Sequence, residues 1–590
     1  MNWPEIYNVV DLMLVFGVSA TAQNLLVGYA GIPAVAPTGF GAIGGYLAAY
    51  FAVNQGWPTL AGLVVGVLVA GLVGFVISVV ALRLSVEYVI LVTVAFAIVV
   101  VDAFTNLGPF GGYVGLIDIP ALRIFGYSFD STLRLLPLFA VVLALTYAFI
   151  RHMGESTFGV LLRALRDNES AAQSIGFRAE PPKVAAFIVA AGFAGLAGGL
   201  LVCMEQVANP SSFGFTEGIL VVAMLIIGGL GRPIGPVIGA FLVELVPQIL
   251  QSAVRLSATT ASLLQQIIFG VLLVVIMIFR PRGITPEKPS ARLRRIAERI
   301  APTPPVSSDT TSSHDESNAV VLDAQRLSKR FGGIQATSGF SFEVRAGEVV
   351  GLVGPNGAGK TTLFNLLCGE IKPDGGRVDL LSQNCTGMRP DEIAARGMVR
   401  SFQDVRLFGG LTVLENVVLA ALPAKSAAFW RTLMHPRRVR SEMITAVEGA
   451  MAVIDRLGLR DKAHILAGRL SFGEQKMVAL ARVMATRVTV LLLDEPIAGV
   501  GTEYGRKLQN VIKTMHSDGA TIVVIEHNLE VVRELATRIL YMESGRVRAE
   551  GTFEELTSNP VLAESYFGAV NEKSSNQLKA TRTAKYSDES

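Results

Sequence analysis

The hydrophobic and polar positions divide the chain into two parts of different character. From Leu12 to Leu82 there is no Asp, Glu, Lys or Arg. A soluble domain of that length needs charge on its water-facing surface, so we expect this stretch to lie in a membrane. After about Ala319, charges recur regularly and apolar runs are short and bounded by turns. The pattern predicts a polytopic α-helical membrane domain followed by a soluble domain.

A bilayer-spanning helix needs about 20 mostly apolar residues. About nine segments fit, with centres near residues 18, 43, 70, 97, 142, 194, 224, 243 and 271. The segments near 224 and 243 are separated only by Gly228–Pro233, which predicts a tight hairpin or a re-entrant pair. Small residues crowd 39–45 and 192–199, which favours close helix packing in lipid or, alternatively, a translocation path lined by broken helices.

Two carboxylates fall within or near these spans. An ionisable group such as Glu244 or Asp102 is costly in a bilayer and tends to face a polar cavity, unless it sits near a helix end. Basic residues gather in two connecting segments, at Arg151, Arg163, Arg166, Arg178 and Lys183, and at Arg280, Arg282, Lys288, Arg292, Arg294 and Arg295. Lys and Arg accumulate on the cytoplasmic side, so we predict an outside N-terminus and an inside C-terminus, where ATP is available.

Composition adds little to this picture. The net charge of +3 on 590 residues gives no indication of nucleic-acid binding, and the three cysteines have neither disulfide nor metal-site spacing. Residues 1–10 lack the basic region of an export signal, so the first apolar segment is interpreted as a retained span. The predicted limits are a membrane domain at 1–284, a linker at 285–318, a soluble domain at 319–570 and a disordered tail at 571–590.

The linker is rich in Pro, Ser, Thr and charge and cannot bury a core. Within it, Ala291–Ile300 predicts a short basic helix that lies against anionic headgroups, or else a solvated run of charge.

A phosphate-binding loop opens the soluble domain. It follows a strand-like run and precedes a helix-like one, and it consists of Gly354, Pro355, Asn356, Gly357, Ala358, Gly359, Lys360 and Thr361, followed by Thr362. The glycines let backbone N–H groups converge on phosphate oxygens at the start of a helix. We expect Lys360 to reach the β- and γ-phosphates of ATP and the Thr361 hydroxyl to ligate Mg²⁺.

Acidic residues follow a second strand-like run. Val488–Leu493 is nearly all apolar, as in a buried parallel strand, and ends at Asp494 and Glu495. Such residues lie beside the phosphate loop, where Asp494 is expected to hold the Mg²⁺ shell and Glu495 to orient or deprotonate the attacking water. Another such strand, Thr521–Ile525, delivers Glu526 and His527 to the same edge, and His527 is predicted to contact the γ-phosphate.

Three further motifs resemble those of ATP-binding cassette proteins. Leu470–Lys476 is similar to the signature sequence, Gln403 in Arg-Ser-Phe-Gln to the glutamine loop, and Phe331 to the aromatic that stacks on adenine. The resemblance implies an α/β P-loop cassette that binds ATP and Mg²⁺, with Gln403 also near the metal. It further implies that two cassettes clamp two ATP molecules, with Ser471 and Gly473 contacting the partner's γ-phosphate. One chain holds one cassette, so a second must come from another subunit.

Two positions depart from that family pattern. Phe472 stands where the signature usually has Gly, a variation that leaves Ser471 and Gly473 in place. Gly501 stands where an aspartate-type residue usually contacts the other cassette, which leaves room for unequal ATP sites.

Both parts of the chain also resemble one transport system, the high-affinity branched-chain amino acid importers. In the cassette the similarity lies at 407–417 and 549–555, and in the membrane part at the segments 28–31, 185–188, 195–198, 227–239 and 279–283. The resemblance implies a fused permease and ATP-binding subunit in a bacterial inner membrane. Its implied partners are a second permease domain and cassette, from a second copy or separate subunits, and an extracytoplasmic solute-binding protein, with lipid around the spans.

Residues 161–176 fit the coupling helix of such permeases, and we expect this segment to dock near Gln403; otherwise it is only a basic loop. Three other functions compete. Permeases for urea or short amides share this architecture. Exporters of the fused type have about six long spans, unlike the short Gly-rich segments here. A non-transporting cassette is disfavoured by the intact Lys360, Asp494, Glu495 and His527.

Overall fold

The computed structural model describes residues 3–253, 258–301, 319–486 and 488–559. They form two compact units. The first comprises Met1–Arg166, Ala179–Arg295 and Lys425–Arg440, and the second Asp167–Arg178, Ile296–Ala424 and Ser441–Ser590. The tail predicted at 571–590, and the part of the predicted linker at 302–318, lie outside the described residues.

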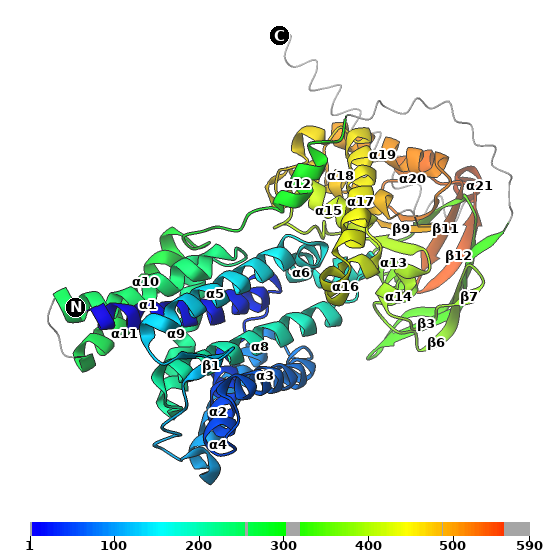
Figure 1. Ribbon diagram of the computed structural model, residues 1–590. Coiled ribbons are helices and arrows are strands. Elements are labelled where there is room, and N and C mark those ends of the chain that lie inside the picture. The colour runs from blue at the N-terminus through cyan, green and yellow to red at the C-terminus, as the bar shows by residue number, and fades with distance from the viewer. Residues whose placement is uncertain (1–2, 254–257, 302–318, 487, 560–590) are drawn as a thin grey trace, which may run out of the picture. The chain divides into compact units, whose positions relative to one another are not determined.

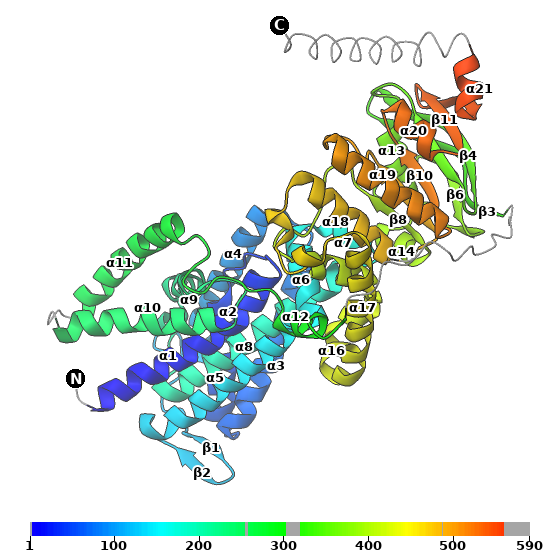
Figure 2. The same cartoon turned by 90° about the horizontal axis from the view of Figure 1, so that it is seen from above.

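The first unit is a helical bundle (Figure 1). Its long helices are α1 (Trp3–Asn24), α2 (Pro37–Val53), α3 (Thr59–Ala81), α4 (Val86–Asn106), α5 (Thr132–Gly154), α8 (Glu180–Glu205), α9 (Phe215–Gly228), α10 (Ile234–Ala253) and α11 (Ala258–Phe279). Every predicted span centre falls inside one of them. A short hairpin of β1 (Leu122–Ile124) and β2 (Tyr127–Phe129) stands at one end of the bundle (Figure 2).

Length and composition identify which of these helices suit a bilayer. Within the described residues, six are long and apolar enough to cross it: Ile6–Tyr29, Thr59–Ala81, Val86–Asn106, Thr132–Gly154, Glu180–Glu205 and Pro210–Gly228. Shorter apolar helices run over Ile234–Val246 and Ile267–Phe279. The chain is therefore a polytopic helical membrane protein, and the count of nine spans stays a prediction.

Glycines set the distance between α2 and α8. A Cβ atom at Gly44 would lie 1.9 Å from the carbonyl oxygen of Gly195, and one at Gly198 would lie 2.0 Å from that of Gly41. Only the absence of side chains lets these two backbones touch, which is how helices associate in lipid. Both runs thus supply close α2–α8 contacts, as the packing interpretation expects, and the translocation-path interpretation stays a prediction.

The α9–α10 connection is a tight helical hairpin. Gly228 ends α9 and Ile234 begins α10, and a Cβ atom at Gly239 would lie 1.9 Å from the carbonyl oxygen of Met224. The turn is held to the end of α1, because Asn24 Oδ1 accepts from the Gly231 N–H at 3.0 Å and Asn24 Nδ2 donates to the Arg232 carbonyl at 3.0 Å.

The two membrane carboxylates differ in environment. Asp102 is exposed and lies one turn before the end of α4, so the helix-end interpretation applies to it. Glu244 lies inside α10, is 7% exposed, and makes no hydrogen bond or ion pair in the part of the chain that the structure describes.

Two sheets organise the second unit (Figure 1). A six-stranded sheet has the order β12-β11-β5-β10-β9-β8, parallel except for β12, and a four-stranded antiparallel sheet has the order β4-β3-β6-β7. The strands are β3 (Val320–Phe331), β4 (Ile334–Arg345), β5 (Val349–Val353), β6 (Gly375–Leu380), β7 (Gln383–Asn384), β8 (Met398–Ser401), β9 (Val490–Asp494), β10 (Thr521–Ile525), β11 (Arg538–Glu543) and β12 (Arg546–Gly551).

Helices complete the second unit. They include α7 (Glu169–Ser174), α13 (Lys360–Leu367), α14 (Pro390–Ala395), α15 (Val413–Ala421), α17 (Pro436–Arg456), α18 (Phe472–Ala485), α19 (Thr502–Ser517), α20 (Leu529–Leu535) and α21 (Phe553–Ser558). Strands β5, β9 and β10 are buried at every residue, as expected of parallel strands covered on both faces. Their carboxyl ends meet at one edge, which is where an α/β sheet places its ligands.

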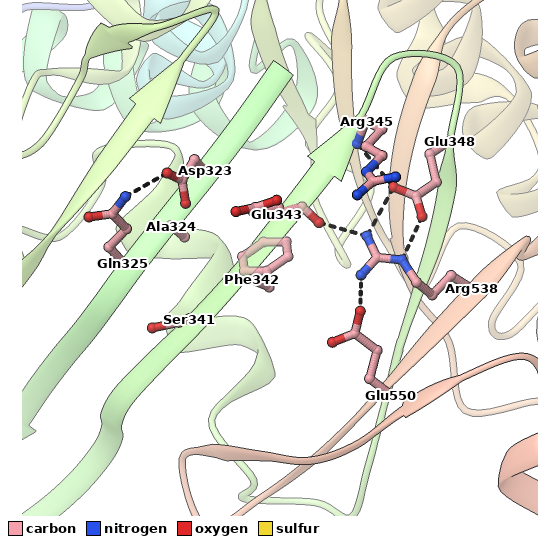
Figure 3. Close-up of a pocket in the computed structure, with 10 residues that line it drawn as sticks. All are labelled: Asp323, Ala324, Gln325, Ser341, Phe342, Glu343, Arg345, Glu348, Arg538 and Glu550. Atoms are coloured by element: carbon pink, nitrogen blue, oxygen red, sulfur yellow. Dashed lines mark hydrogen bonds and ion pairs between the residues drawn. The ribbon is translucent and has the colours of Figure 1, made fainter. Parts of the chain in front are cut away.

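Arg538 ties the antiparallel strands to the main sheet (Figure 3). Its guanidinium contacts both carboxylate oxygens of Glu348, at 2.5 and 2.9 Å, and donates to the Glu343 carbonyl at 2.7 Å. A further ion pair joins it to Glu550 on β12. These residues line a cavity of about 580 Å³ on the cassette surface. Because the Arg538 guanidinium is engaged by Glu348, Glu550 and a backbone carbonyl, we interpret this cluster as a structural clamp.

Candidate functional site

The loop between β5 and α13 forms the phosphate cradle. Gly354 and Gly359 have φ values of 152° and 100°, which L side chains rarely adopt. A Cβ atom would lie 2.0 Å from the Met542 carbonyl oxygen at the first position and 2.2 Å from that of Ala336 at the second. Glycine is therefore required at both, and the predicted strand–loop–helix context is present.

Lys360 begins α13 and turns back across the cradle. Its ammonium donates to the carbonyl oxygens of Gly354 at 2.7 Å and Pro355 at 3.0 Å. Burial lowers the pKa of Lys360, while the nearby carboxylates of Glu495 and Asp494 oppose this shift. Thr361 and Thr362 follow in the first turn of the same helix, with Thr361 exposed.

Asp494 ends β9 as a buried carboxylate with one oxygen engaged. Its Oδ2 accepts from Arg400 Nη2 at 2.7 Å, whereas Oδ1 has no hydrogen-bond partner. Burial raises the pKa of Asp494, and the Arg400 guanidinium counters that rise. One oxygen of this carboxylate is thus left to accept a further bond.

Glu495 is held between two other predicted site residues. Gln403 Nε2 donates to its Oε2 at 3.0 Å, and His527 Nε2 lies 3.0 Å from its Oε1. Its backbone has a φ of 46°, an uncommon conformation for a non-glycine residue, and its N–H bonds to the Ile525 carbonyl at 2.9 Å. The structure therefore brings Gln403, Glu495 and His527 together at the carboxyl ends of β8, β9 and β10.

Glu526 is the buried neighbour of that group. It is 2% exposed, and its Oε1 accepts from the Ile497 N–H at 3.0 Å. Burial raises the pKa of Glu526 to about 7. The side chain thus braces the segment that follows Glu495.

The signature segment begins α18. Ser471 is the exposed N-cap, and its side chain and that of Glu474 form a capping box. Gly473 lies against Tyr504, where a Cβ atom would come within 2.7 Å of the ring. Ser471 is thus exposed, whereas Gly473 is buried.

Phe331 ends β3 as a 46% exposed aromatic ring. The Lys329 ammonium lies 5.7 Å from its centroid. The ring thus belongs to the four-stranded sheet, whereas the phosphate cradle follows β5 of the six-stranded sheet.

Two residues of the site escaped the sequence reasoning. Arg400, which the motif analysis assigns no role, is the counter-ion of Asp494. Lys476 donates to the carbonyls of Glu495 at 2.9 Å and Ala498 at 2.6 Å, so it joins α18 to the segment after β9. The sequence signal for Arg400 was a cation within a short strand-like segment, and for Lys476 it was a cation at a buried position of a helix.

Comparisons with known proteins cover both parts of the chain. A family model described as the branched-chain amino acid transport system permease component matches residues 6–277, and an ABC transporter model matches residues 337–498. The high-affinity branched-chain amino acid transport ATP-binding protein LivG of Salmonella typhimurium is 36% identical over 249 residues, covering 42% of this chain and 98% of LivG.

The chain belongs to the ABC transporter family.

Other relatives of this ABC transporter are similar over the cassette. A putative ribose/galactose/methyl galactoside import ATP-binding protein of Rhizobium meliloti is 34% identical over 226 residues, covering 38% of this chain and 42% of that protein. A crystal structure of a nucleotide-free ATP-binding cassette is 31% identical, with a TM-score of 0.37, covering 42% of this chain and 98% of that one. The reaction of this ABC transporter's cassette is ATP hydrolysis.

The two departures from the family pattern are visible in the fold. Phe472 is 49% exposed, with the Lys476 ammonium 5.4 Å from its ring, so it is accommodated at the surface. Gly501 is the N-cap of α19 and provides no side-chain cap.

Proposed function

We propose that the chain is the fused permease and ATP-binding subunit of an importer that takes up branched-chain amino acids across a bacterial inner membrane. The observation that carries this proposal is the agreement of two separate parts of the chain. The membrane part matches the permease component of that transport system, and the cassette is similar to the system's ATP-binding protein. The cassette then lies in the cytoplasm.

At the cassette, the loop from Gly354 to Thr362 holds the ATP phosphates and Phe331 stacks on the adenine. Mg²⁺ fits Asp494 Oδ1, a buried oxygen without a partner, together with Thr361 and Gln403. The described residues contain no cluster of three acidic, His or Cys ligands, which suits Mg²⁺ because it keeps waters and phosphate oxygens as ligands. The ion supplies charge neutralisation at the β- and γ-phosphates when bound.

Glu495 and His527 act on the attacking water. Glu495 accepts its proton, and Gln403 and His527 hold the carboxylate in place through the contacts at 3.0 Å. His527 then contacts the γ-phosphate once nucleotide occupies the cradle. These roles for Glu495, Gln403 and His527 follow from their positions at one sheet edge beside Lys360.

A working unit requires more than one chain. The exposed Ser471, with Gly473 behind it, reaches the γ-phosphate in a partner cassette. A second permease domain completes the path for the solute, either from a second copy or from a separate subunit. An extracytoplasmic binding protein delivers the solute, and lipid surrounds the spans.

Residues 161–176, the coupling segment, link ATP hydrolysis to the permease. In the second compact unit, Asp167 Oδ2 accepts from the Gly410 N–H at 2.6 Å, and α7 packs beside α14. Gly410 lies in the loop that begins at Gln403. A change in the position of Gln403 during the ATP cycle would therefore reach α7 through this loop.

Labelled-solute uptake in the native host tests the substrate. Strains with the normal chain and with Lys360→Ala, at equal membrane abundance, are offered leucine, urea and ribose in turn. We expect leucine uptake to collapse in Lys360→Ala while the other two stay unchanged. Loss of urea uptake alone would instead establish the urea and amide alternative, and loss of ribose uptake alone a sugar importer.

A further inference from the structure

A polar cavity lies within the first compact unit, at the ends of its helices. Its volume is about 290 Å³, and its lining includes Tyr29, Arg151, Arg163, Arg232 and Lys288. These residues come from five places in the sequence: the π-helical turn Leu25–Tyr29 after α1, the end of α5, the helix α6 (Thr157–Asp167), the α9–α10 turn and the segment after α11. Four cations therefore surround one space.

The carboxylates nearby compensate only part of this charge. Arg151 pairs with Glu155 at 3.1 Å, and Arg163, which is 2% exposed, lies 3.8 Å from Glu287. Glu287 is shared, because Arg166 also contacts it at 2.9 Å. Arg163 is buried, so its charge requires a nearby anion, whereas Arg232 is half-buried and Arg151 and Lys288 are exposed.

Two of the four cations have no counter-ion in the fold. Arg232 and Lys288 make no ion pair with any carboxylate of the described residues. Tyr29 lines the same space, is 4% exposed, and its hydroxyl donates no hydrogen bond within that part of the chain. Two free cations and a free hydroxyl donor thus face one cavity.

The position of the cavity indicates which anion is available. The ends of α1, α5 and α11 and the α9–α10 turn are all on the side that the basic segments place in the cytoplasm. At this level a membrane presents its headgroups, and basic pockets between helices there suit anionic lipids. The nearby α12 (Ala291–Ala297) adds further arginines.

We propose that this cavity binds the phosphate headgroup of an anionic phospholipid. Its volume equals that of about ten water molecules, enough for a phosphodiester but too small for acyl chains. Arginine guanidinium groups bind phosphate oxygens in pairs, and Lys288 and the Tyr29 hydroxyl add single donors. Arg163 belongs to α6 and to the segment 161–176 that fits the coupling helix, so the headgroup would stabilise the first part of that segment.

Native mass spectrometry of the full chain tests the proposal. The protein is exchanged from mixed phosphatidylglycerol and phosphatidylcholine vesicles, and the retained lipids are counted. The normal chain should retain phosphatidylglycerol preferentially. Arg232→Gln with Lys288→Gln should weaken retention about tenfold for each cation removed, and Tyr29→Phe, which removes only a hydroxyl, about fivefold.

The matched control is Arg280→Gln with Arg282→Gln, which removes two exposed cations of the same membrane face that do not line the cavity. It should keep the preference. Equal losses in the control and cavity variants would overturn the proposal in favour of general surface charge. Unchanged retention in the cavity variant would also overturn it. Thermal stabilisation by millimolar inorganic phosphate as large as that by phosphatidylglycerol would show a free-anion site and contradict the lipid.

Discussion

Arg400 and Asp494 form a buried ion pair at the end of neighbouring strands β8 and β9, with side chains 4% and 1% exposed. The Arg400 guanidinium neutralises one carboxylate oxygen and leaves the other for a ligand. Removing one partner of such a pair leaves an uncompensated buried charge, which costs about 3–5 kcal/mol.

Arg400→Gln should therefore lower the free energy of unfolding of the cassette by about 3 kcal/mol. Denaturant unfolding of the solubilised chain measures this change. Arg377→Gln is the matched control, because the Arg377 side chain is 54% exposed and its pair with Asp379 should contribute little to stability. Equal stability of the two variants would show that Asp494 does not need Arg400.

Glu526 makes the stability of the cassette depend on pH. Burial raises its pKa from 4.5 to about 7, so the folded chain holds this proton more tightly than the unfolded chain does. The stabilisation is complete below pH 4.5 and is lost as the pH rises through 7. It amounts to about 3 kcal/mol at most.

Glu526→Gln keeps a carbonyl acceptor for Ile497 and removes the titration. The variant should gain stability relative to the normal chain as the pH rises from 5 to 8, measured as the difference in unfolding midpoint. Glu448→Gln, at an exposed position of α17, should show no such change. A difference that stays constant with pH would mean that Glu526 is not held protonated.

At the scale of elements, the α2–α8 contact tests how the membrane helices associate. Gly44→Val puts a branched side chain where even a Cβ atom lies 1.9 Å from the Gly195 carbonyl oxygen. Overpacking of this kind costs about 1–3 kcal/mol or more. We expect less folded protein in the membrane and a lower unfolding midpoint in detergent.

Gly270→Ala is the control, because nothing lies within 4 Å of a Cβ atom there. Alanine also has a higher helix propensity than glycine. If both substitutions reduced the folded fraction equally, the role of Gly44 would be helix flexibility and not close packing of α2 against α8.

The coupling segment is the second element with a direct test. Asn168 is the N-cap of α7, and the neighbouring Asp167 bonds to the Gly410 N–H. Cysteines at Asn168 and Gly410 should therefore cross-link within one chain on mild oxidation. The three native cysteines are buried, so background should be low. A complete lack of cross-linking to any cassette would contradict the hypothesis that residues 161–176 dock near Gln403.

Elements with strong sequence periodicity were predicted closely. Apolar runs located the membrane helices, and the all-buried β5 and β9 were recognisable because parallel strands covered on both faces lack alternation. Sheet order was not accessible in this way. The contact of Arg400 with Asp494 depends on β8 lying next to β9, although about ninety residues separate them in sequence.

At the scale of the whole molecule, the order of the motifs along the sequence predicts the P-loop cassette, because each motif contributes one group to the same ATP site. The sequence assigns Lys360, Asp494, Glu495 and His527 to one sheet edge. In the structure the Lys360 ammonium lies near both carboxylates, and His527 Nε2 lies 3.0 Å from Glu495 Oε1. The polar cavity beside Arg163 was not predicted, since its lining comes from five separate segments. Only the folded chain assembles them.

The central claim is that this cassette's ATP hydrolysis drives solute through the membrane part of its own chain. Uptake of labelled leucine in the native host, with the normal chain or Glu495→Gln at equal membrane abundance, tests it most directly. We expect uptake to fall about 10²–10⁴-fold, because the variant loses a general base, while ATP binding to the solubilised protein is retained. Unchanged uptake in a Glu495→Gln strain that still binds ATP would contradict the account.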